Sequence, residues 1–321
     1  MAPTRKHITY IVHGARADRA DLRQMVSWVG DRGHAVDVRI TWNRGDAEAL
    51  AAEAADRGTD VVVACGGDGT LNEVVNGLLA EPDAVAADPF DRPAVAVVPG
   101  GSANVFARAL GSPRDPVEAT AAILAALRAR RSTLVGLGRT EPGRNARGRW
   151  FTFNAGLGWD AEVVAAVERA RAAGREATPL RYASTAIAHY LHQLRRPRSM
   201  TVQVAAAEPV PDVRLAFITC TDIWTYLGGR AVRTNPGTSV RSGLGLFGVR
   251  DLGAGTIAPT LHRILTPGGD PRGRNVLRQD AVEWVTVRSA EPVALQVDGD
   301  HLGQYAEVRF RAVRDALRVV V

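Results

Sequence analysis

Two short apolar runs, each leading into a pair of glycines, restrict the fold of this chain more than any other feature of its sequence. The runs span residues 61–65 and 94–98, and the glycine pairs occupy residues 66–67 and 100–101. A strand that is apolar at every position is typical of a parallel sheet covered on both faces. Glycine allows the turn after such a strand to be sharp and to bring the backbone close to a ligand. The pattern therefore predicts two strands of a parallel sheet with glycine turns at their carboxyl ends.

Strand and helix patterns alternate around these runs as far as residue 132. After the first glycine pair, apolar residues recur with the period of an amphipathic helix. Repeated strand–helix units predict an α/β domain with a doubly wound parallel sheet. The expected strands are residues 8–12, 36–40, 61–65 and 94–98, and the expected helices are residues 18–31, 45–57, 71–79, 105–110 and 120–130.

The pattern changes after residue 132. Short alternating segments separated by Gly, Pro and Asp predict an antiparallel, β-rich sandwich or barrel-like second domain. One stretch, residues 160–195, is predicted to be a helical insertion. A chain of 321 residues is also near the length at which single cores divide into two. The expected strands are residues 133–137, 150–154, 200–204, 213–220, 244–249, 284–287, 293–297 and 308–310.

The charge of the chain favours an anionic partner. Its net charge is +6 and its isoelectric point is near 10. ATP, an acidic membrane surface and nucleic acid all fit such a charge, although arginine spread along a chain is equally typical of GC-rich coding. Nucleic acid is the least favoured, because no recognised module or basic stripe interleaved with aromatic residues is present. The densest basic stretches contain Arg128, Arg130 and Arg131, and Arg195, Arg196 and Arg198.

The sequence favours a cytoplasmic location. No apolar run approaches the length needed to span a bilayer. The basic start is followed by a strand-like segment at residues 8–12 rather than by the apolar core of a signal peptide. Cys65 and Cys220 are too few and too far apart for a disulfide framework or a zinc site. We therefore expect a reduced protein.

The sharpest chemical motif is Gly-Gly-Asp-Gly-Thr at residues 66–70, between the first apolar run and the amphipathic helix. The start of a helix offers unpaired N–H groups and positive dipole character to a phosphate. Asp68 could hold Mg²⁺ against phosphate oxygens, because Mg²⁺ prefers one or two carboxylates plus substrate phosphates. Thr70 adds a hydroxyl. The alternative is a plain strand–helix turn in which these residues cap the helix.

A second glycine turn, at residues 99–104, points to the same chemistry. In a parallel sheet both turns lie at the carboxyl ends of strands, where ligands bind. Ser102 could bond a phosphate or a ribose, and Asn104 and Arg108 could fix the turn or meet a nucleotide. A tight turn with a serine cap is the alternative for this motif alone. The two turns together favour a shared nucleotide site.

Two motifs of the second domain carry polar residues. Asp298-Gly299-Asp300 follows the alternating segment 293–297. Asp-Gly between strands is a favoured hairpin turn, but paired carboxylates could also accept the proton of an attacking hydroxyl. Asn154 opens the other motif, whose glycines precede Asp160 and suggest a loop that faces a ligand. Asp160 is equally suited to capping a helix.

The four motifs resemble the catalytic domain of the diacylglycerol kinase family, which includes bacterial lipid kinases and sphingosine kinases. The resemblance rests on residues 66–77, 99–108, 154–161 and 298–300 and runs over nearly the whole chain. The glycine-rich Asp motif is shared with NAD kinases and phosphofructokinases. The second glycine turn and the late Asp-Gly-acid motif are more specific to the lipid kinases.

The resemblance implies an ATP-binding α/β domain at residues 1–132, similar to NAD kinase and phosphofructokinase, to which residues 313–321 return. It also implies a β-rich lipid domain at residues 133–312 and a cleft between the two. Asp68 would work with catalytic Mg²⁺. Asp300 is the first choice for general base and Asp298 the second, while Asp160 and Asn154 would face the lipid. The implied ATP site is made of Thr41, Gly66, Gly67, Asp68, Gly69, Thr70, Leu71, Asn72, Gly101 and Ser102.

The chain departs from the family pattern at three places. Residues 12–16 replace the family's Asn-Pro-x-Ser-Gly turn, which alters one phosphate contact. Ser242 stands where bacterial relatives have an Asp that helps a structural Mg²⁺ site, so we expect that site to be absent or water-bridged. Asp300 stands where the family usually has Glu.

The function that the resemblance implies is ATP-dependent phosphorylation of a lipid hydroxyl, as in phospholipid biosynthesis. The enzyme would meet its lipid at a membrane surface, with the two arginine stretches contacting acidic head groups. Diacylglycerol, monoacylglycerol, a sphingoid base, a polyprenol and a glycolipid fit the motifs equally. A kinase of a soluble acceptor such as NAD, and a nucleotide- or lipid-binding sensor without turnover, are the alternatives.

Overall fold

A computed structural model describes residues 5–17, 20–80, 88–143, 146–158, 199–227 and 229–321. The chain divides into two compact units, Met1–Gly136 with Arg314–Val321 and Leu137–Val313. The predicted insertion at 160–195, with Asp160 and the arginines at 195–198, lies outside the described residues. Each unit is built around its own sheet region and core.

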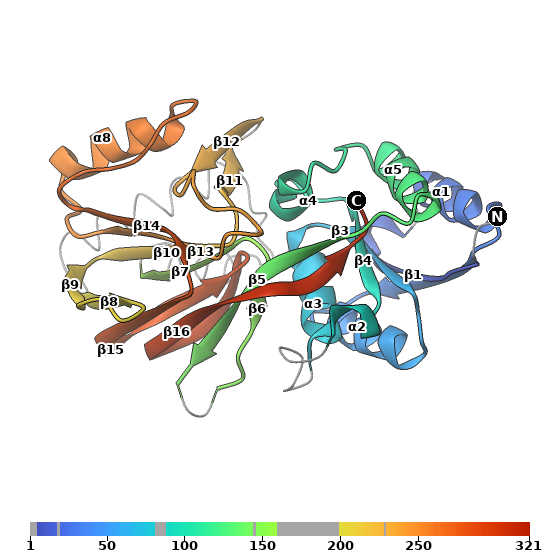
Figure 1. The fold of residues 1–321 in the computed structure, drawn as a ribbon, viewed down its shortest axis with the longest axis horizontal. Coiled ribbons are helices and arrows are strands. Elements are labelled where there is room, and N and C mark those ends of the chain that lie inside the picture. Colours follow the sequence, from blue (N-terminus) through green and yellow to red (C-terminus); the bar gives the residue numbers. More distant parts are fainter. Residues whose placement is uncertain (1–4, 18–19, 81–87, 144–145, 159–198, 228) are drawn as a thin grey trace. The chain divides into compact units, whose positions relative to one another are not determined.

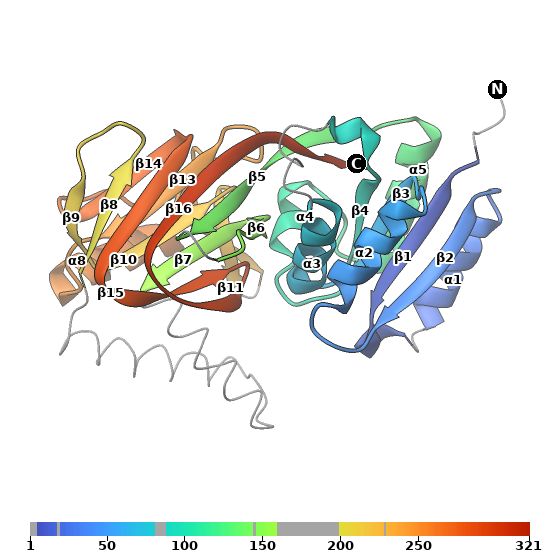
Figure 2. The same cartoon turned by 90° about the horizontal axis from the view of Figure 1, so that it is seen from below.

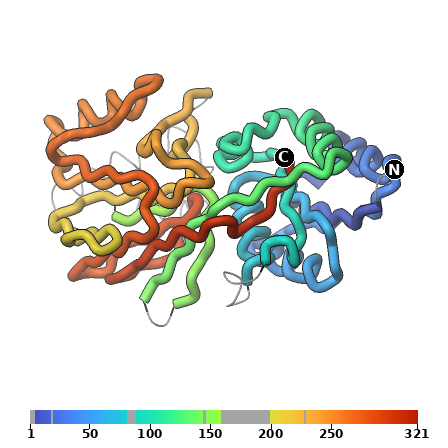
Figure 3. The backbone as a smooth tube through the Cα atoms, viewed as in Figure 1, coloured from blue at the N-terminus to red at the C-terminus, as the bar shows by residue number. Residues whose placement is uncertain are grey.

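The first unit contains a parallel sheet with the strand order β4-β3-β1-β2. Every residue of β3 and β4 is buried, as expected for strands covered on both faces. At the chain's end Val319 pairs in parallel with Val95 of β4, and Figure 3 shows this terminal segment running beside that strand. The strands are β1 (His7–His13), β2 (Ala35–Thr41), β3 (Val61–Gly66) and β4 (Ala94–Pro99).

Helices cover both faces of this sheet (Figures 1 and 2). Apolar side chains of α1 and α5, such as Met25 and Ile123, share a core with those of β1, β3 and β4. On the other face α3 packs closely on α2, with Gly77 next to the backbone of Glu48. The arrangement confirms the predicted doubly wound sheet. The helices are α1 (Ala20–Gly30), α2 (Asp46–Asp56), α3 (Asp68–Leu78), α4 (Val105–Ala109) and α5 (Pro116–Arg128), with 3-10 turns η1 (Gly14–Arg16) and η3 (Pro89–Asp91).

The second unit is β-rich and mostly antiparallel, as predicted. Its main strand order is β14-β13-β10-β7-β15-β16, with β8 on β15 and β6 on β5. Phe151, Leu157, Leu246 and Phe310 are among the side chains of its main core. The elements are β5 (Thr133–Pro142), β6 (Trp150–Phe151), β7 (Asn154–Gly158), β8 (Met200–Val204), β9 (Val210–Val213), β10 (Leu215–Thr219), β11 (Ile223–Leu227), β12 (Arg230–Arg233), β13 (Leu244–Val249), α8 (Ala254–Leu265), β14 (Val276–Val282), β15 (Trp284–Val297) and β16 (Asp300–Val319).

The second unit differs from the sequence prediction in several details, among them the strands β11, β12 and β14, which were not expected. The expected strand at 150–154 is interrupted, because the backbone at residues 152–154 donates hydrogen bonds to a side chain instead of to a neighbouring strand. The expected strands 284–287 and 293–297 are one strand, β15, with a register shift between Arg288 and Val293. Helix α8 was not expected, because Pro259 lies inside it and proline usually ends a helix.

Candidate functional site

Four loops leave the sheet of the first unit at its carboxyl edge. The register pairs His13 with Thr41, Val12 with Cys65 and Gly66 with Pro99, so strands β1 to β4 end side by side. Ligands of parallel α/β sheets bind at this edge. Both glycine turns that the sequence singles out are therefore neighbours in space.

The two glycine turns touch each other. The N–H of Gly100 donates to the carbonyl of Gly66 at 2.7 Å. A Cβ on Gly101 would lie 2.8 Å from Cα of Gly67, and a Cβ on Gly66 would lie 2.5 Å from Oγ1 of Thr70. A side chain at Gly101 would force the two turns apart, whereas a side chain at Gly66 would collide with Thr70 of the same turn. Gly101 is thus needed by the contact between the turns, and Gly66 by the packing of the first turn itself, whether or not a ligand is bound.

The first turn leads directly into α3, whose first residue is Asp68. Gly67 is the N-cap and offers no capping side chain, so the N–H groups of the first helical turn face the end of the helix. Asp68 is half-buried there, and Gly69 is exposed. A Cβ on Gly69 would meet nothing within 4 Å. The side of Gly69, in the first turn of α3, is therefore open, and an anion placed there would be near the positive end of the helix dipole.

Asn104 shapes the second turn with its side-chain amide. Its Oδ1 accepts from the N–H of Gly101 at 2.9 Å, and its Nδ2 donates to the carbonyl of Gly101 at 2.7 Å. The backbone of Asn104 is left-handed, with φ of 47°. Ser102, between these residues, is exposed. The amide thus fixes the loop and leaves the Ser102 hydroxyl at its surface.

Two residues that the sequence analysis did not assign lie at the same edge. Arg16, on η1, is 12% exposed and its Nη1 lies 3.5 Å from the carbonyl oxygen of Pro99. A Cβ on Gly100 would lie 2.6 Å from that Nη1, so the guanidinium packs on the second turn. Trp42, directly after β2, is 74% exposed. Trp42 follows β2 directly and Arg16 ends the short turn after β1, so their places after strands of the sheet are the signal that could have identified them.

Four residues predicted to line the ATP site, Thr41, Thr70, Leu71 and Asn72, have buried side chains. Thr41 is 7% exposed at the end of β2. Leu71 and Asn72 are 1% and 0% exposed, and Nδ2 of Asn76 donates to the carbonyl and to Oδ1 of Asn72. The N–H of Leu71 donates to the carbonyl of Gly67 at 3.2 Å. Leu71 is thus tied to the glycine turn through its backbone, and Asn72 to the next turn of α3 through Asn76.

In the second unit, Asp298 and Gly299 form a two-residue hairpin turn between β15 and β16. Val297 pairs with Asp300, and φ is 48° at Asp298 and 88° at Gly299. Positive φ at both central residues is the mark of a type I′ turn. The hairpin interpretation of this motif is therefore confirmed. Asp300, the first residue of β16, is half-buried.

The carboxylate of Asp298 holds the interrupted strand of the second unit. Its Oδ2 accepts from the N–H and the hydroxyl of Thr152 at 2.7 and 2.8 Å. Its Oδ1 accepts from the N–H groups of Phe153 and Asn154 at 3.1 and 3.0 Å. Burial and, secondly, the negative charge of Asp298 raise the pKa of the Cys220 thiol. Asp298 is 6% exposed, so its oxygens are already engaged.

Asn154 is engaged in the same support. Its Nδ2 donates to the carbonyl of Trp224 at 3.1 Å, and its Oδ1 accepts from Nε2 of Gln296 at 2.8 Å. Oε1 of Gln296 accepts in turn from the N–H of Gly299 at 2.9 Å. Asn154, expected to face a substrate, thus braces the hairpin that carries Asp300.

The described residues fit a metal that arrives with phosphates better than a preformed metal cage. Within the described ranges, no three His, Cys, Asp or Glu side chains are grouped to hold a metal ion. Asp68 is a single carboxylate beside the glycine turns, and Mg²⁺ commonly uses one carboxylate together with substrate phosphates and water. The Ser242 hydroxyl, at the position for which the sequence analysis expected no intact structural Mg²⁺ site, accepts from the Ser239 N–H at 2.8 Å.

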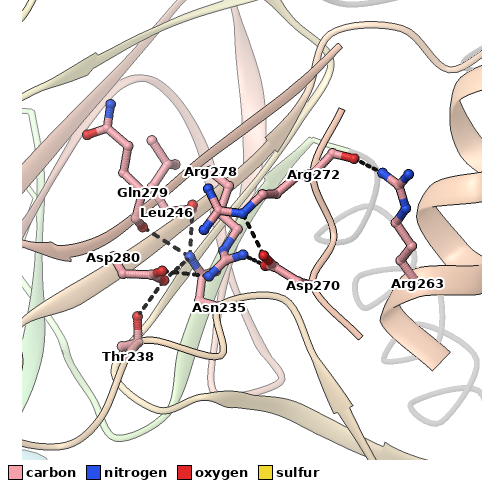
Figure 4. A network of polar contacts seen from close by, with 9 residues as sticks. All are labelled: Asn235, Thr238, Leu246, Arg263, Asp270, Arg272, Arg278, Gln279 and Asp280. Carbon is pink, nitrogen blue, oxygen red and sulfur yellow. Dashed lines mark hydrogen bonds and ion pairs between the residues drawn. The ribbon is translucent and has the colours of Figure 1, made fainter. Parts of the chain in front are cut away.

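A polar network joins residues 235–238, which precede Ser242, to strand β14 (Figure 4). Oδ1 of Asp280 accepts from Nδ2 of Asn235 at 2.9 Å and from the hydroxyl of Thr238 at 3.1 Å. Arg278, 6% exposed in its side chain, pairs with Asp280 and with Asp270. Although burial opposes the shift, the hydrogen bonds from Asn235 and Arg278 hold the pKa of Asp280 below its usual value. An arginine thus supplies the positive charge in this cluster.

Comparison with known sequences gives a family match and related proteins. Residues 7–135 match the diacylglycerol kinase catalytic domain. A Chromohalobacter salexigens protein named probable lipid kinase YegS-like is 44% identical over 34% of this chain, an alignment that covers only 33% of that relative. A Xanthomonas axonopodis pv. citri protein of the same name is 31% identical over 94% of this chain and 91% of the relative.

Comparison with solved structures supports the fold. A crystal structure of a diacylglycerol kinase from Bacillus anthracis superposes with a TM-score of 0.68 at 16% identity, covering 99% of this chain and 97% of the other. At that identity the likeness concerns the fold alone. In the part of the chain that the structure describes, no helix has the length and apolar character needed to cross a membrane.

Proposed function

Because this chain belongs to the lipid kinase family that carries the diacylglycerol kinase catalytic domain, we propose that it transfers the γ-phosphoryl group of ATP to a hydroxyl of a membrane lipid. Diacylglycerol is the first acceptor to test. The observation that carries the proposal is the contact between the two glycine turns beside the first turn of α3, where the side of Gly69 is open.

In this proposal the first unit binds the phosphates. N–H groups at the start of α3 donate to phosphate oxygens, and Arg16 neutralises part of their charge. Trp42 offers an exposed ring on which the adenine base can stack. Asp68 would hold Mg²⁺, which supplies charge neutralisation at the transferring phosphoryl group. These contributions are positioning and electrostatics, which account for most of the acceleration in phosphoryl transfer.

The second unit supplies the base. We assign this role to Asp300, because the oxygens of Asp298 already accept four hydrogen bonds. Asp300 takes the proton of the lipid hydroxyl as the hydroxyl oxygen bonds to the γ-phosphorus. The bond from that phosphorus to the bridging oxygen breaks, and ADP leaves with the electron pair. Asp298 and Asn154 act as positioning residues. The lipid acceptor requires peripheral contact with a membrane surface.

The test is transfer of labelled γ-phosphate from ATP, with Mg²⁺, to diacylglycerol and other lipids in mixed micelles, with NAD as a soluble acceptor. We expect labelled lipid from the wild type and none from Asp68→Ala. Glu307→Gln, which changes an exposed carboxylate on β16, is the matched control and keeps activity. Label on NAD would replace the proposal by a soluble-acceptor kinase. ATP binding without any labelled product would replace it by a sensor.

A further inference from the structure

A cavity of about 570 Å³ lies at the amino-terminal edge of the first unit's sheet. Its walls come from the residues before β1, β2 and β3, the start of β4, the end of α5 and the end of the chain. Val61, which begins β3, is part of the lining, whereas Gly66 at the other end of β3 begins the first glycine turn. At about 3.3 Å per residue the two ends are about 17 Å apart. The cavity is therefore separate from the glycine turns.

The lining is strongly basic. Among the described residues that line the cavity, Asp60 is the one carboxylate, and it is paired with Lys6 at 2.6 Å. The N–H of His7 also donates to Asp60, at 2.8 Å. Charge of one sign around a cavity with apolar walls concentrates the electric field inside it. The basic residues of the lining are Lys6, Arg32, Arg128, Arg130, Arg131 and Arg318.

His34, the histidine of the lining, is affected by the same positive charges. Burial, together with the positive charges of Arg32 and Lys6, lowers the pKa of His34, although Asp60 acts in the opposite direction. Arg318 is fixed in the wall, because its Nη2 donates to the carbonyl of Arg92 at 3.1 Å and its guanidinium lies 5.1 Å from the ring centre of Phe90. A preorganised guanidinium loses less freedom when an anion binds.

The turn after α5 carries arginine where glycine would be easier to accommodate. Arg130 has φ of 54°, its N–H donates to the carbonyl of Leu127 at 3.1 Å, and the N–H of Arg131 donates to that of Ala126 at 2.8 Å. These bonds define a helix-ending motif whose left-handed residue is usually glycine. Basic residues near a helix carboxyl end also complement the helix dipole. That explanation covers α5 but not Lys6, Arg32 and Arg318, which come from other segments.

We propose that this cavity is a second anion site, which binds a ligand bearing a phosphate monoester group. Several arginines around one concavity suit a phosphate, because each guanidinium can donate two parallel hydrogen bonds to its oxygens. Val61, Ala94, Leu124 and Val320 form an apolar part of the lining that can accept the carbon skeleton next to the phosphate. The site is distinct from the proposed site of phosphoryl transfer. A soluble phosphate ester and a phosphatidic acid head group share this chemistry.

The test compares two probes on the full chain. Glycerol 3-phosphate is titrated while the melting temperature is followed, and co-sedimentation is measured with phosphatidylcholine vesicles with and without phosphatidic acid. The pocket variant is Arg128→Ala with Arg131→Ala. The matched control is Arg23→Ala with Arg39→Ala, which removes two positive charges from the same unit outside the cavity.

We expect the wild type and the control to bind at least one probe, and the pocket variant to bind it at least about tenfold more weakly. Binding of glycerol 3-phosphate would identify a soluble ester, and binding only of phosphatidic acid vesicles would identify a lipid head group. The Arg130→Gly protein should melt at a higher temperature without ligand, because glycine adopts the left-handed backbone more easily. It should nevertheless bind the probe more weakly than the wild type, so that a loss of binding cannot be attributed to a loss of stability. Equal weakening in the control and pocket variants, or no binding of either probe by the wild type, would overturn the proposal.

Discussion

The glycine turn before α3 and the hairpin at Asp298 are both short turns with an aspartate next to a glycine, yet their surroundings are opposite. Next to the glycine turn, the space beside Gly69 is open and Gly67 supplies no cap. In the hairpin, the carboxylate of Asp298 accepts four hydrogen bonds and is buried. Similar sequence patterns thus build a surface that can receive a ligand and a brace that cannot. The difference lies in what surrounds the polar groups.

Removing the brace should have the largest effect. Asp298→Ala leaves donors of Thr152, Phe153 and Asn154 buried without their acceptor, at about 1–3 kcal/mol for each unsatisfied group. We expect the free energy of unfolding of the second unit to fall by at least about 3 kcal/mol, measured by urea denaturation. Glu291→Ala, an exposed carboxylate of β15, should leave it unchanged. Equal stability of the Asp298→Ala protein would remove the distinction between the two turns.

Changing the other aspartate of the hairpin should affect activity alone. Asp300→Asn keeps the shape of the side chain but removes its ability to take a proton. We expect the rate of phosphate transfer to lipid to fall about 10²–10⁴-fold, the usual contribution of a general base, while the urea midpoint stays the same. Transfer at the wild-type rate by the folded variant would return the role of base to Asp298 or to water.

Two alanine substitutions separate packing within the first glycine turn from contact with a ligand. Gly66→Ala places a methyl group 2.5 Å from Oγ1 of Thr70, so we expect a loss of stability of about 1–3 kcal/mol. Gly69→Ala meets no neighbour and replaces glycine inside a helix, so stability should rise by about 0.5–1 kcal/mol. ATP affinity, measured by calorimetry, should nevertheless fall. Unchanged affinity in Gly69→Ala would mean that phosphate does not approach that side of the turn.

The smallest effect is expected at Trp42. Stacking of a base on an aromatic side chain is worth about 1–3 kcal/mol, so Trp42→Ala should raise the KM for ATP about tenfold with little change in kcat. Trp28→Ala on α1 is the matched control for loss of an indole elsewhere in the first unit. A fall in kcat without a change in KM would place Trp42 outside nucleotide binding.

The sheet of the first unit could be predicted because its evidence is local. Uniformly apolar runs, such as residues 61–65, and the helical period after them depend only on neighbouring residues. The contact of Gly66 with Gly100 was foreseeable in outline, because the carboxyl ends of parallel strands lie together. Arg16 was expected only as part of the altered turn at residues 12–16, and its packing on Gly100 was not foreseen, because tertiary contacts decide which side chain lies there.

The second unit could be predicted less completely, because several of its features depend on contacts between residues far apart in the sequence. The split of the expected strand at 150–154 is caused by Asp298, and no periodicity within the strand contains that information. Helix α8 was missed because Pro259 is normally a sign that a helix ends. The hairpin at Asp298 was expected from its Asp-Gly sequence, whereas its second role as a brace could only be found in three dimensions.

The hydrogen bonds of Asp298 have a consequence for how the protein folds. The turn itself joins adjacent residues, but its bond to Thr152 joins residues 146 positions apart. Closing so long a loop carries a larger entropy loss than closing a hairpin, and contacts of high sequence separation slow folding. We therefore expect the β15–β16 hairpin to form early, before the segment at residues 152–154 binds to Asp298. The local geometry around Asp300 would then be among the last parts of the second unit to become fixed.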